Sequence, residues 1–271
     1  MQGLHDFIPT EDKIRYINAL LKVGFDTIDF GSFVSPKAIP QMADTAKVLE
    51  GLDLSETDTT LLAIIANQRG ALQAAEFEQI DYLGYPFSIS ESFQLRNTNA
   101  TIEESLDRVK HIQEICIKHN KKLVIYISMG FGNPYGDVWN VDIVNKWVNT
   151  LTELEIPIFQ LSDTIGVARP ETIEHLFSNL IPAHPNVEIG AHFHTTMSTW
   201  EEKVQSAWDN GCRRFDGTIG GLGGCPMAQD ELVGNMPSEQ LIWFATERSI
   251  PTGLNLVKYG ECRRIASQIM S

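Results

Sequence analysis

The feature of this sequence that most constrains its fold is a regular alternation between short apolar runs and amphipathic helical segments. Apolar, β-rich runs predict seven strands, at Thr27–Phe30, Thr60–Ala66, Ile80–Phe87, Leu123–Ser128, Ile156–Leu161, Val187–His194 and Arg213–Thr218. Helical patterns separate them, among them Thr10–Val23, Ile102–His119, Val141–Leu154, Pro170–Leu180 and Thr199–Asn210. Strands that alternate with helices in this way form a parallel sheet whose faces are covered.

Seven strand–helix units in 271 residues fit a (β/α)8 TIM barrel better than an open sheet. The first strong element is the helical pattern Thr10–Val23, so we expect the first barrel strand to be absent from this chain. The sequence contains no linker, repeat array or low-complexity segment. We therefore expect residues 1–271 to form a single barrel domain, α/β in class.

Composition favours an enzyme of a reducing compartment, and we expect it to be cytoplasmic. The net charge of −14 and the pI near 4.9 argue against a nucleic-acid partner or an anionic membrane. An anionic substrate would therefore need a basic pocket or a metal ion. The four cysteines are too widely spaced for a disulfide framework. No apolar run approaches the roughly 20 residues of a membrane span, and the N-terminus has no signal-peptide pattern.

Two motifs near the C-terminus suggest a metal site beside a loop that carries a thiol. His192 and His194 follow an apolar run, and in a strand this spacing directs both imidazoles to one face, where they can reach a single ion. Residues 220–225 contain four glycines and end at Cys225, so the backbone there can bend closely around a ligand. Taken singly, a His-x-His pair in a strand is about as often structural as metal-binding, and a glycine cluster with a cysteine is usually a turn.

Barrel geometry makes the strand ends a functional map, because active sites gather at the carboxyl ends of the strands. Polar residues recur at these ends: Asp29, Ser88, Ser90, Glu91, Ser128, Asp163, His192 and His194, with Cys225 in the loop after the last strand. Chance placement would rarely give this pattern. A strand-end Asp or Ser also often caps the next helix, so individual positions have a structural alternative.

With these motifs the sequence resembles the 3-hydroxy-3-methylglutaryl-CoA lyase family. Its members belong to a group of metal-dependent barrels that make or break carbon–carbon bonds through enolates. The resemblance runs over nearly the whole chain. Its segments are Ser32-Phe33-Val34-Ser35-Pro36-Lys37, Pro40-Gln41-Met42, Ser90-Glu91-Ser92-Phe93, Asn133-Pro134-Tyr135, Ser162-Asp163-Thr164-Ile165-Gly166, the histidine pair, Gly221-Leu222-Gly223-Gly224-Cys225-Pro226, Gly234-Asn235 and Glu239. The glycine–cysteine–proline loop separates the lyases from their synthase relatives and carries the most weight.

The sequence also departs from this family. Its members carry an Arg-Asp pair at the end of the first strand, and the resemblance places that pair immediately upstream of Met1. The Asp would be a metal ligand, and the Arg would neutralise the charge of the enolate. Asp29 stands where Glu is usual, and Thr195 stands where Asp or Asn is usual. The segment from Cys225 to Asn235 is one residue longer than in typical members.

The resemblance implies retro-Claisen cleavage of 3-hydroxy-3-methylglutaryl-CoA, or a related 3-hydroxyacyl-CoA, to acetyl-CoA and acetoacetate. We expect His192, His194 and Asn235 to bind a divalent cation, Mg²⁺ or Mn²⁺, because mixed N and O ligands suit these ions better than zinc. The expected catalytic residues are Cys225, which would protonate the enolate, together with Asp163, Asp29 and His192. Asp163 has an alternative role as a helix cap or an anchor. The expected substrate-binding residues are Gln2, Ser35, Ser90 and Asn133.

Two other functions compete with the lyase. A condensing synthase of the same superfamily would commonly carry extra C-terminal domains, whereas this chain ends after one last helical pattern, Leu254–Met270. A non-catalytic metal-binding barrel would explain the missing Arg-Asp pair, but not the other strand-end residues. For the lyase we expect an acyl-CoA substrate, no nucleic-acid or membrane partner, and a homo-oligomer, namely a dimer.

Overall fold

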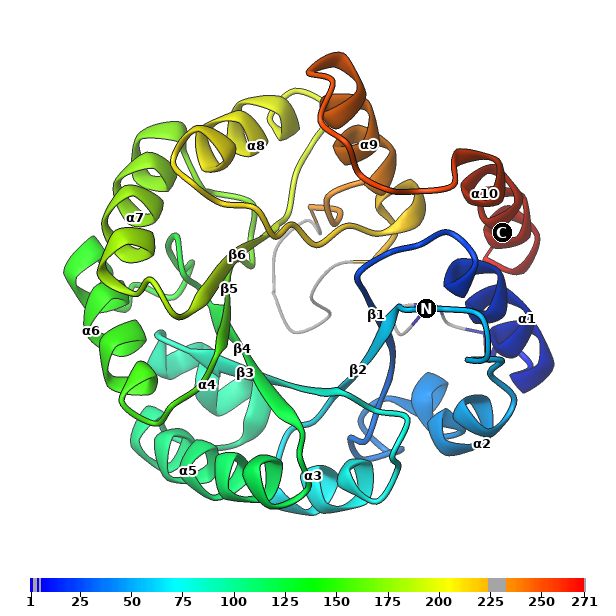
Figure 1. Ribbon diagram of the computed structural model, residues 1–271. Helices are drawn as coiled ribbons and strands as arrows, with labels where there is room; N and C mark the ends of the chain where they lie inside the picture. Colours follow the sequence, from blue (N-terminus) through cyan, green and yellow to red (C-terminus); the bar gives the residue numbers. More distant parts are fainter. Residues whose placement is uncertain (2–3, 5, 224–232, 271) are drawn as a thin grey trace.

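The computed structural model describes residues 1, 4, 6–223 and 233–270 (Figure 1). Its strands are β1 Thr27–Ser32, β2 Thr60–Ile64, β3 Tyr82–Ser88, β4 Lys122–Ser128, β5 Ile158–Asp163 and β6 Glu188–Phe193. Its α-helices are α1 Thr10–Leu21, α2 Thr45–Glu50, α3 Gln68–Ala75, α4 Glu91–Thr98, α5 Ile102–Lys118, α6 Val141–Thr152, α7 Pro170–Ala183, α8 Trp200–Asp209, α9 Ser238–Glu247 and α10 Leu256–Ile269. Two 3₁₀ turns, η1 Pro40–Met42 and η2 Ile219–Gly221, complete the elements.

The six strands form one parallel sheet in the order β1-β2-β3-β4-β5-β6, so each strand pairs with its neighbour in sequence. The sheet curls, and the helices surround its convex side (Figure 1). This is the wall of a TIM barrel, as the alternation predicts. In the described part of the chain, β1 pairs only with β2, which fits the prediction of a barrel without its first strand.

The strand predicted at Arg213–Thr218 is not a strand in the structure. The segment follows β6 for one step, through the bridge between Ala191 and Phe215. It then makes a second isolated bridge, between Thr218 and Pro237. A barrel strand is normally held on both sides, and here only single bridges hold the segment. It occupies the place of a strand without forming a continuous ladder.

The barrel interior is divided into an apolar layer and a polar layer. Leu62, Val124 and Ile158 come from three strands and form a small cluster, separate from the main core between sheet and helices. Tyr126 packs on this cluster and also contacts His192. The apolar cluster therefore adjoins the polar groups on the inner face of the sheet.

Local signals in the sequence define the helices around this wall. The longest helix, α5, begins with a capping box in which Thr101 and Glu104 each bond to the other's backbone N–H. Its buried face includes Val109, Ile112 and Cys116, which recur at helical spacing and join the main core. No helix in the described ranges is both long and apolar enough to cross a bilayer.

Candidate active site

The carboxyl end of β6 places two histidines beside each other. His192 and His194 have ring centroids 5.6 Å apart, and their planes are tilted by 54°. The side chain of His192 is 29% exposed, whereas His194 is almost fully buried. Tyr126 of β4 packs edge-on against His192, with ring centroids 5.5 Å apart. The structure therefore brings the two imidazoles together, as their i, i+2 spacing predicts.

A carboxylate from the segment after β6 contacts His192. Asp216 Oδ2 lies 3.0 Å from Nδ1 of His192. The other oxygen of Asp216, Oδ1, accepts a 2.8 Å hydrogen bond from Nε2 of Gln160 on β5. Gln160 is fully buried. Gln160, Asp216 and His192 thus form a continuous line of polar contacts along the barrel wall.

His194 lies against Asn235, the third residue expected to bind the metal ion. The two residues form an antiparallel bridge, and the side chain of Asn235 hydrogen-bonds to the His194 ring. Asn235 Nδ2 donates to the carbonyl of Leu222 at 3.0 Å, which fixes the orientation of the amide. Burial, followed by the electrostatic influence of His192 and Lys203, lowers the pKa of His194 to about 3. His194 is therefore a neutral imidazole at physiological pH, the form that binds metal ions.

Asp29 of β1 belongs to the same electrostatic environment. Its side chain is accessible to solvent, although protein surrounds it. This enclosure, with the nearby negative charge of Asp216, raises the pKa of Asp29 to about 7, while His192 acts in the opposite direction. A carboxyl group that titrates near neutrality can give and take protons at physiological pH. The charge of Asp29 is thus coupled to both members of the Asp216–His192 pair.

Asp163 is fully engaged by its neighbours. Its Oδ2 accepts a 2.6 Å bond from Nζ of Lys203, and its Oδ1 accepts bonds from the backbone N–H groups of Val167 and Ala168 at 2.8 and 3.0 Å. Both members of this ion pair are buried. Nζ of Lys203 also donates to the carbonyl of His194 at 3.0 Å. These contacts favour the anchoring role for Asp163 over a free acid or base.

Two of the expected substrate-binding residues, Ser90 and Asn133, hold a loop in place. Oγ of Ser90 donates a 2.5 Å bond to Oδ2 of Asp137, and Ser92 donates to the same carboxylate through its backbone and hydroxyl groups. The Asn133 side chain bonds to the backbone of Tyr135 and Asp137. These contacts join the loop after β4 to the start of α4.

The remaining residues expected to bind substrate or to act as the acid are Ser35, Gln2 and Cys225. Ser35 lies in an exposed turn after β1, and its carbonyl accepts bonds from the N–H groups of Ala38 and Ile39 at 2.9 and 3.0 Å. Gln2, expected to bind substrate, and Cys225, the expected acid, lie outside the described residues.

Sequence reasoning missed four residues that support the histidine pair: Tyr126, Gln160, Lys203 and Asp216. A signal for Asp216 exists in the predicted strand Arg213–Thr218, where residues 214, 216 and 218 share one face. Gln160 is a polar residue inside the apolar run of β5, which marks it as a group that needs a buried partner. The contact of Lys203 with Asp163 joins residues 40 positions apart and leaves no local pattern.

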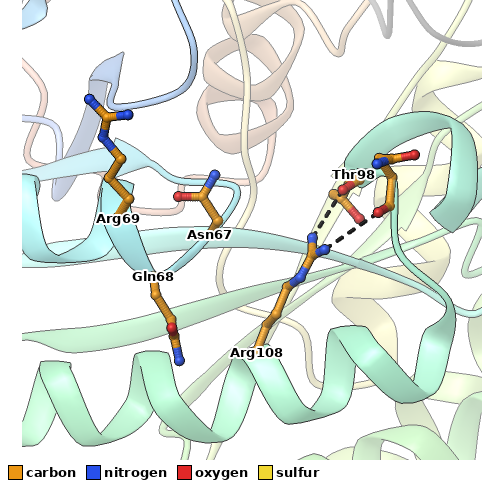
Figure 2. A pocket seen from close by; sticks show the side chains of 6 residues that line it. Asn67, Gln68, Arg69, Thr98 and Arg108 are labelled. Carbon is orange, nitrogen blue, oxygen red and sulfur yellow. Dashed lines mark hydrogen bonds between the residues drawn. The ribbon is translucent and has the colours of Figure 1, made fainter.

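A shallow depression of about 380 Å³ lies between the start of α3 and the start of α5 (Figure 2). Its lining includes Asn67, Arg69, Thr98 and Arg108. The Arg108 guanidinium donates to the carbonyls of Thr98 and Asn99 at 3.0 and 3.4 Å. Since α3 follows the carboxyl end of β2, the depression lies near the end of the barrel that carries the histidines.

Comparison with known proteins then decides the family. The sequence profile described as HMGL-like matches residues 1–265. The chain belongs to the HMGL-like family. A hydroxymethylglutaryl-CoA lyase of Bacillus subtilis is 35% identical over 252 residues, which cover 93% of this chain and 83% of the relative. A Pseudomonas aeruginosa relative, named as a 3-hydroxy-3-isohexenylglutaryl-CoA/hydroxymethylglutaryl-CoA lyase, is 33% identical over 92% of this chain and 82% of its own length.

Solved structures of lyases in this family share the fold. An HMG-CoA lyase of Bacillus subtilis matches with a TM-score of 0.92 and 33% identity, covering 100% of this chain and 90% of that one. An HMG-CoA lyase of Acinetobacter baumannii, solved with coenzyme A and 3-methylmalate, gives a TM-score of 0.91 at 31% identity over 99% of this chain and 87% of that one. These matches confirm the resemblance and the TIM-barrel fold.

Lyases of this family depend on a metal ion, and the residues present fit one. The described ranges contain no cluster of three His, Cys, Asp or Glu side chains, so an ion at the histidine pair needs other ligands as well. Asn235 supplies an amide oxygen beside His194, with its nitrogen already bonded to Leu222. Two imidazoles and an amide oxygen form a partial set of N and O ligands, which is suitable for a divalent cation.

Proposed function

We propose that this chain is a metal-dependent carbon–carbon lyase that cleaves 3-hydroxy-3-methylglutaryl-CoA to acetyl-CoA and acetoacetate. The observation that carries the proposal is the cluster of His192, His194 and Asn235, in a chain of the HMGL-like family. The Pseudomonas aeruginosa relative is named for two substrates, which supports a related 3-hydroxyacyl-CoA as the alternative substrate. Different residues around the cluster are then assigned to substrate binding and to proton transfer.

His192, His194 and Asn235 would hold the divalent ion, Mg²⁺ or Mn²⁺. When bound, the ion would act as a Lewis acid that lowers the pKa of a hydroxyl group and polarises a carbonyl group. The neutral state of His194 keeps a ring nitrogen available for this purpose. Asp216 orients His192, and the Lys203–Asp163 pair supports the backbone at His194. Asp163 therefore acts by positioning.

The reaction needs one proton to leave the substrate hydroxyl and one to arrive at the new methyl group. We assign the first transfer to Asp29, whose pKa of about 7 lets it accept a proton at physiological pH. The hydroxyl carbon becomes the ketone of acetoacetate, and the electrons of the broken carbon–carbon bond remain on the acetyl-CoA fragment as its enolate. Cys225 is assigned to protonate that enolate, as the resemblance implies.

The depression between α3 and α5 is a candidate for the anionic end of coenzyme A. Arg69 and Arg108 lie there in a chain whose net charge is −14, so they provide local positive charge that the protein as a whole lacks. The depression lies near the same end of the barrel as the histidines. In this proposal Arg69 contributes to binding of phosphate groups, while Arg108 also holds the loop at Thr98 (Figure 2).

The direct test is an assay of acetoacetate and acetyl-CoA formed from 3-hydroxy-3-methylglutaryl-CoA. The proposal expects both products in equal amounts, loss of activity with a chelator, and recovery with Mg²⁺ or Mn²⁺. His194→Ala should abolish turnover, whereas His111→Ala on the exposed face of α5 should not. If neither 3-hydroxy-3-methylglutaryl-CoA nor a related 3-hydroxyacyl-CoA were cleaved with metal present, the lyase proposal would be wrong. In a parallel reaction supplied with acetyl-CoA and a ketoacid, condensation of the two would indicate a synthase.

A further inference from the structure

Asp216 meets His192 in a way that constrains where the imidazole carries its proton. We infer that Asp216 is a positioning residue that holds His192 in the tautomer protonated on Nδ1, and so leaves Nε2 free to bind the metal ion. The functional value of this tautomer rests on the proposed metal site, whereas the tautomer itself can be measured without a metal ion. An ionised carboxylate can only accept hydrogen bonds, so the nitrogen 3.0 Å from Asp216 Oδ2 must be the donor.

Gln160 fixes the other oxygen of the carboxylate. Its Nε2 donates to Asp216 Oδ1 at 2.8 Å, and only the amide nitrogen, not the amide oxygen, can face a carboxylate. Gln160 is fully buried on β5, and Gly190 of β6 makes room for it. A Cβ atom at position 190 would lie 2.1 Å from Oε1 of Gln160. The carboxylate is therefore held by a side chain that has little freedom to move.

The ring of His192 is constrained from a second direction. Tyr126 packs edge-on against it at an interplanar angle of 88°. His194 is held differently, by burial, by the backbone of Thr164 and by the Asn235 side chain. Removal of Asp216 should therefore affect the ring of His192 more than the ring of His194. Carboxylate–histidine–metal arrangements orient a ligand and typically change metal affinity about 10- to 100-fold when the carboxylate is lost.

The test reads the tautomer directly, by ¹⁵N NMR of the imidazole rings in protein labelled at its seven histidines. The His192 signals are assigned by their loss in His192→Gln. In the native chain we expect His192 to be protonated on Nδ1. Asp216→Asn should populate the Nε2-protonated ring and weaken Mn²⁺ binding about 10- to 100-fold, measured by titration of the metal-free protein. Gln160→Met, which removes the donor, should change both readouts in the same direction but less.

Asp209→Asn is the matched control, because Asp209 also accepts a 2.7 Å bond from a glutamine, Gln205, but lies on the exposed surface of α8. It should leave the tautomer and the Mn²⁺ affinity unchanged. A native His192 protonated on Nε2, or a tautomer insensitive to both Asp216→Asn and Gln160→Met, would overturn the inference. If Mn²⁺ failed to broaden the signals of either histidine in the native protein, the metal site of the proposed function would be wrong, and the tautomer measurement would still decide the role of Asp216.

Discussion

At the scale of single residues, the barrel interior places Asp29, Asp163 and His194 in different electrostatic surroundings. Burial raises the pKa of Asp163 above its usual value, while its ion pair with Lys203 acts in the opposite direction, and burial keeps His194 neutral. Asp29 is accessible, and its pKa is raised to about 7. The two positions have the same prominence in the sequence, yet their surroundings differ: Asp163 is buried in an ion pair, whereas Asp29 is accessible.

The raised pKa of Asp29 gives a prediction with a defined sign. The folded state holds this proton up to about pH 7, whereas an ordinary carboxyl releases it near 3.8. The folded state therefore binds more protons between these values, and its stability falls as the pH rises from about 4 to about 7. Asp29→Asn should remove this dependence. The melting temperature of the variant, relative to that of the native chain, should therefore increase as the pH rises across that range. Asp58→Asn, at an exposed loop position, should run parallel to the native curve.

A second prediction at the scale of single residues concerns Arg69 and its proposed contact with coenzyme A. If the depression of Figure 2 binds the phosphate end of coenzyme A, Arg69→Gln should raise KM several-fold and leave kcat nearly unchanged, because the contact is far from the reacting bond and is the same in ground and transition states. Arg15→Gln removes an exposed arginine of α1 and serves as the control. Steady-state kinetics at two salt concentrations measures the effect. An unchanged KM would remove this depression from the binding site.

At the scale of secondary-structure elements, Lys203 of α8 joins β5, the loop after it and the end of β6. Its Nζ donates to Asp163, to the carbonyl of Gly166 and to the carbonyl of His194, at 2.6, 2.9 and 3.0 Å. Lys203→Met should leave the Asp163 carboxylate buried without its cationic partner and lower the free energy of unfolding by about 3–5 kcal/mol. Adding Asp163→Asn should restore part of that loss. Urea denaturation of both variants, beside the exposed Lys118→Met, provides the measurement, and a double variant no more stable than Lys203→Met would contradict the pairing.

Elements also show why some features could be predicted from sequence and others could not. The positions of β1 to β6 follow from apolar runs, a local signal that survives in the fold. The segment Arg213–Thr218 has the same local signal, yet it forms only single bridges, one to Ala191 of β6 and one to Pro237, and nothing in its local sequence indicates this. The histidine pair was predictable from its i, i+2 spacing. The partnership of Gln160 with Asp216 joins residues 56 positions apart, and nothing in either local sequence specifies it.

At the scale of the whole molecule, the sheet ends at β1 on one side and at the segment after β6 on the other. An open sheet edge exposes N–H and C=O groups that can pair with other chains. The resemblance places a further strand, ending in an Arg-Asp pair, immediately upstream of Met1. Such a strand would lie between these two edges and would bring a carboxylate toward the histidines from the open side.

A version of the chain extended by that upstream strand should therefore melt at a higher temperature, contain a smaller fraction of self-associated protein and bind Mn²⁺ more tightly. A second extension of equal length, with Ala-Ala in place of Arg-Asp, separates the two effects. It should keep the gain in melting temperature, because the strand still pairs, but lose the gain in metal affinity, because the added carboxylate is gone. Calorimetry, sedimentation and metal titration of the three proteins measure these quantities. Equal melting temperatures and equal monomer fractions for the original and extended chains would show that the edges of β1 and the segment after β6 need no strand between them.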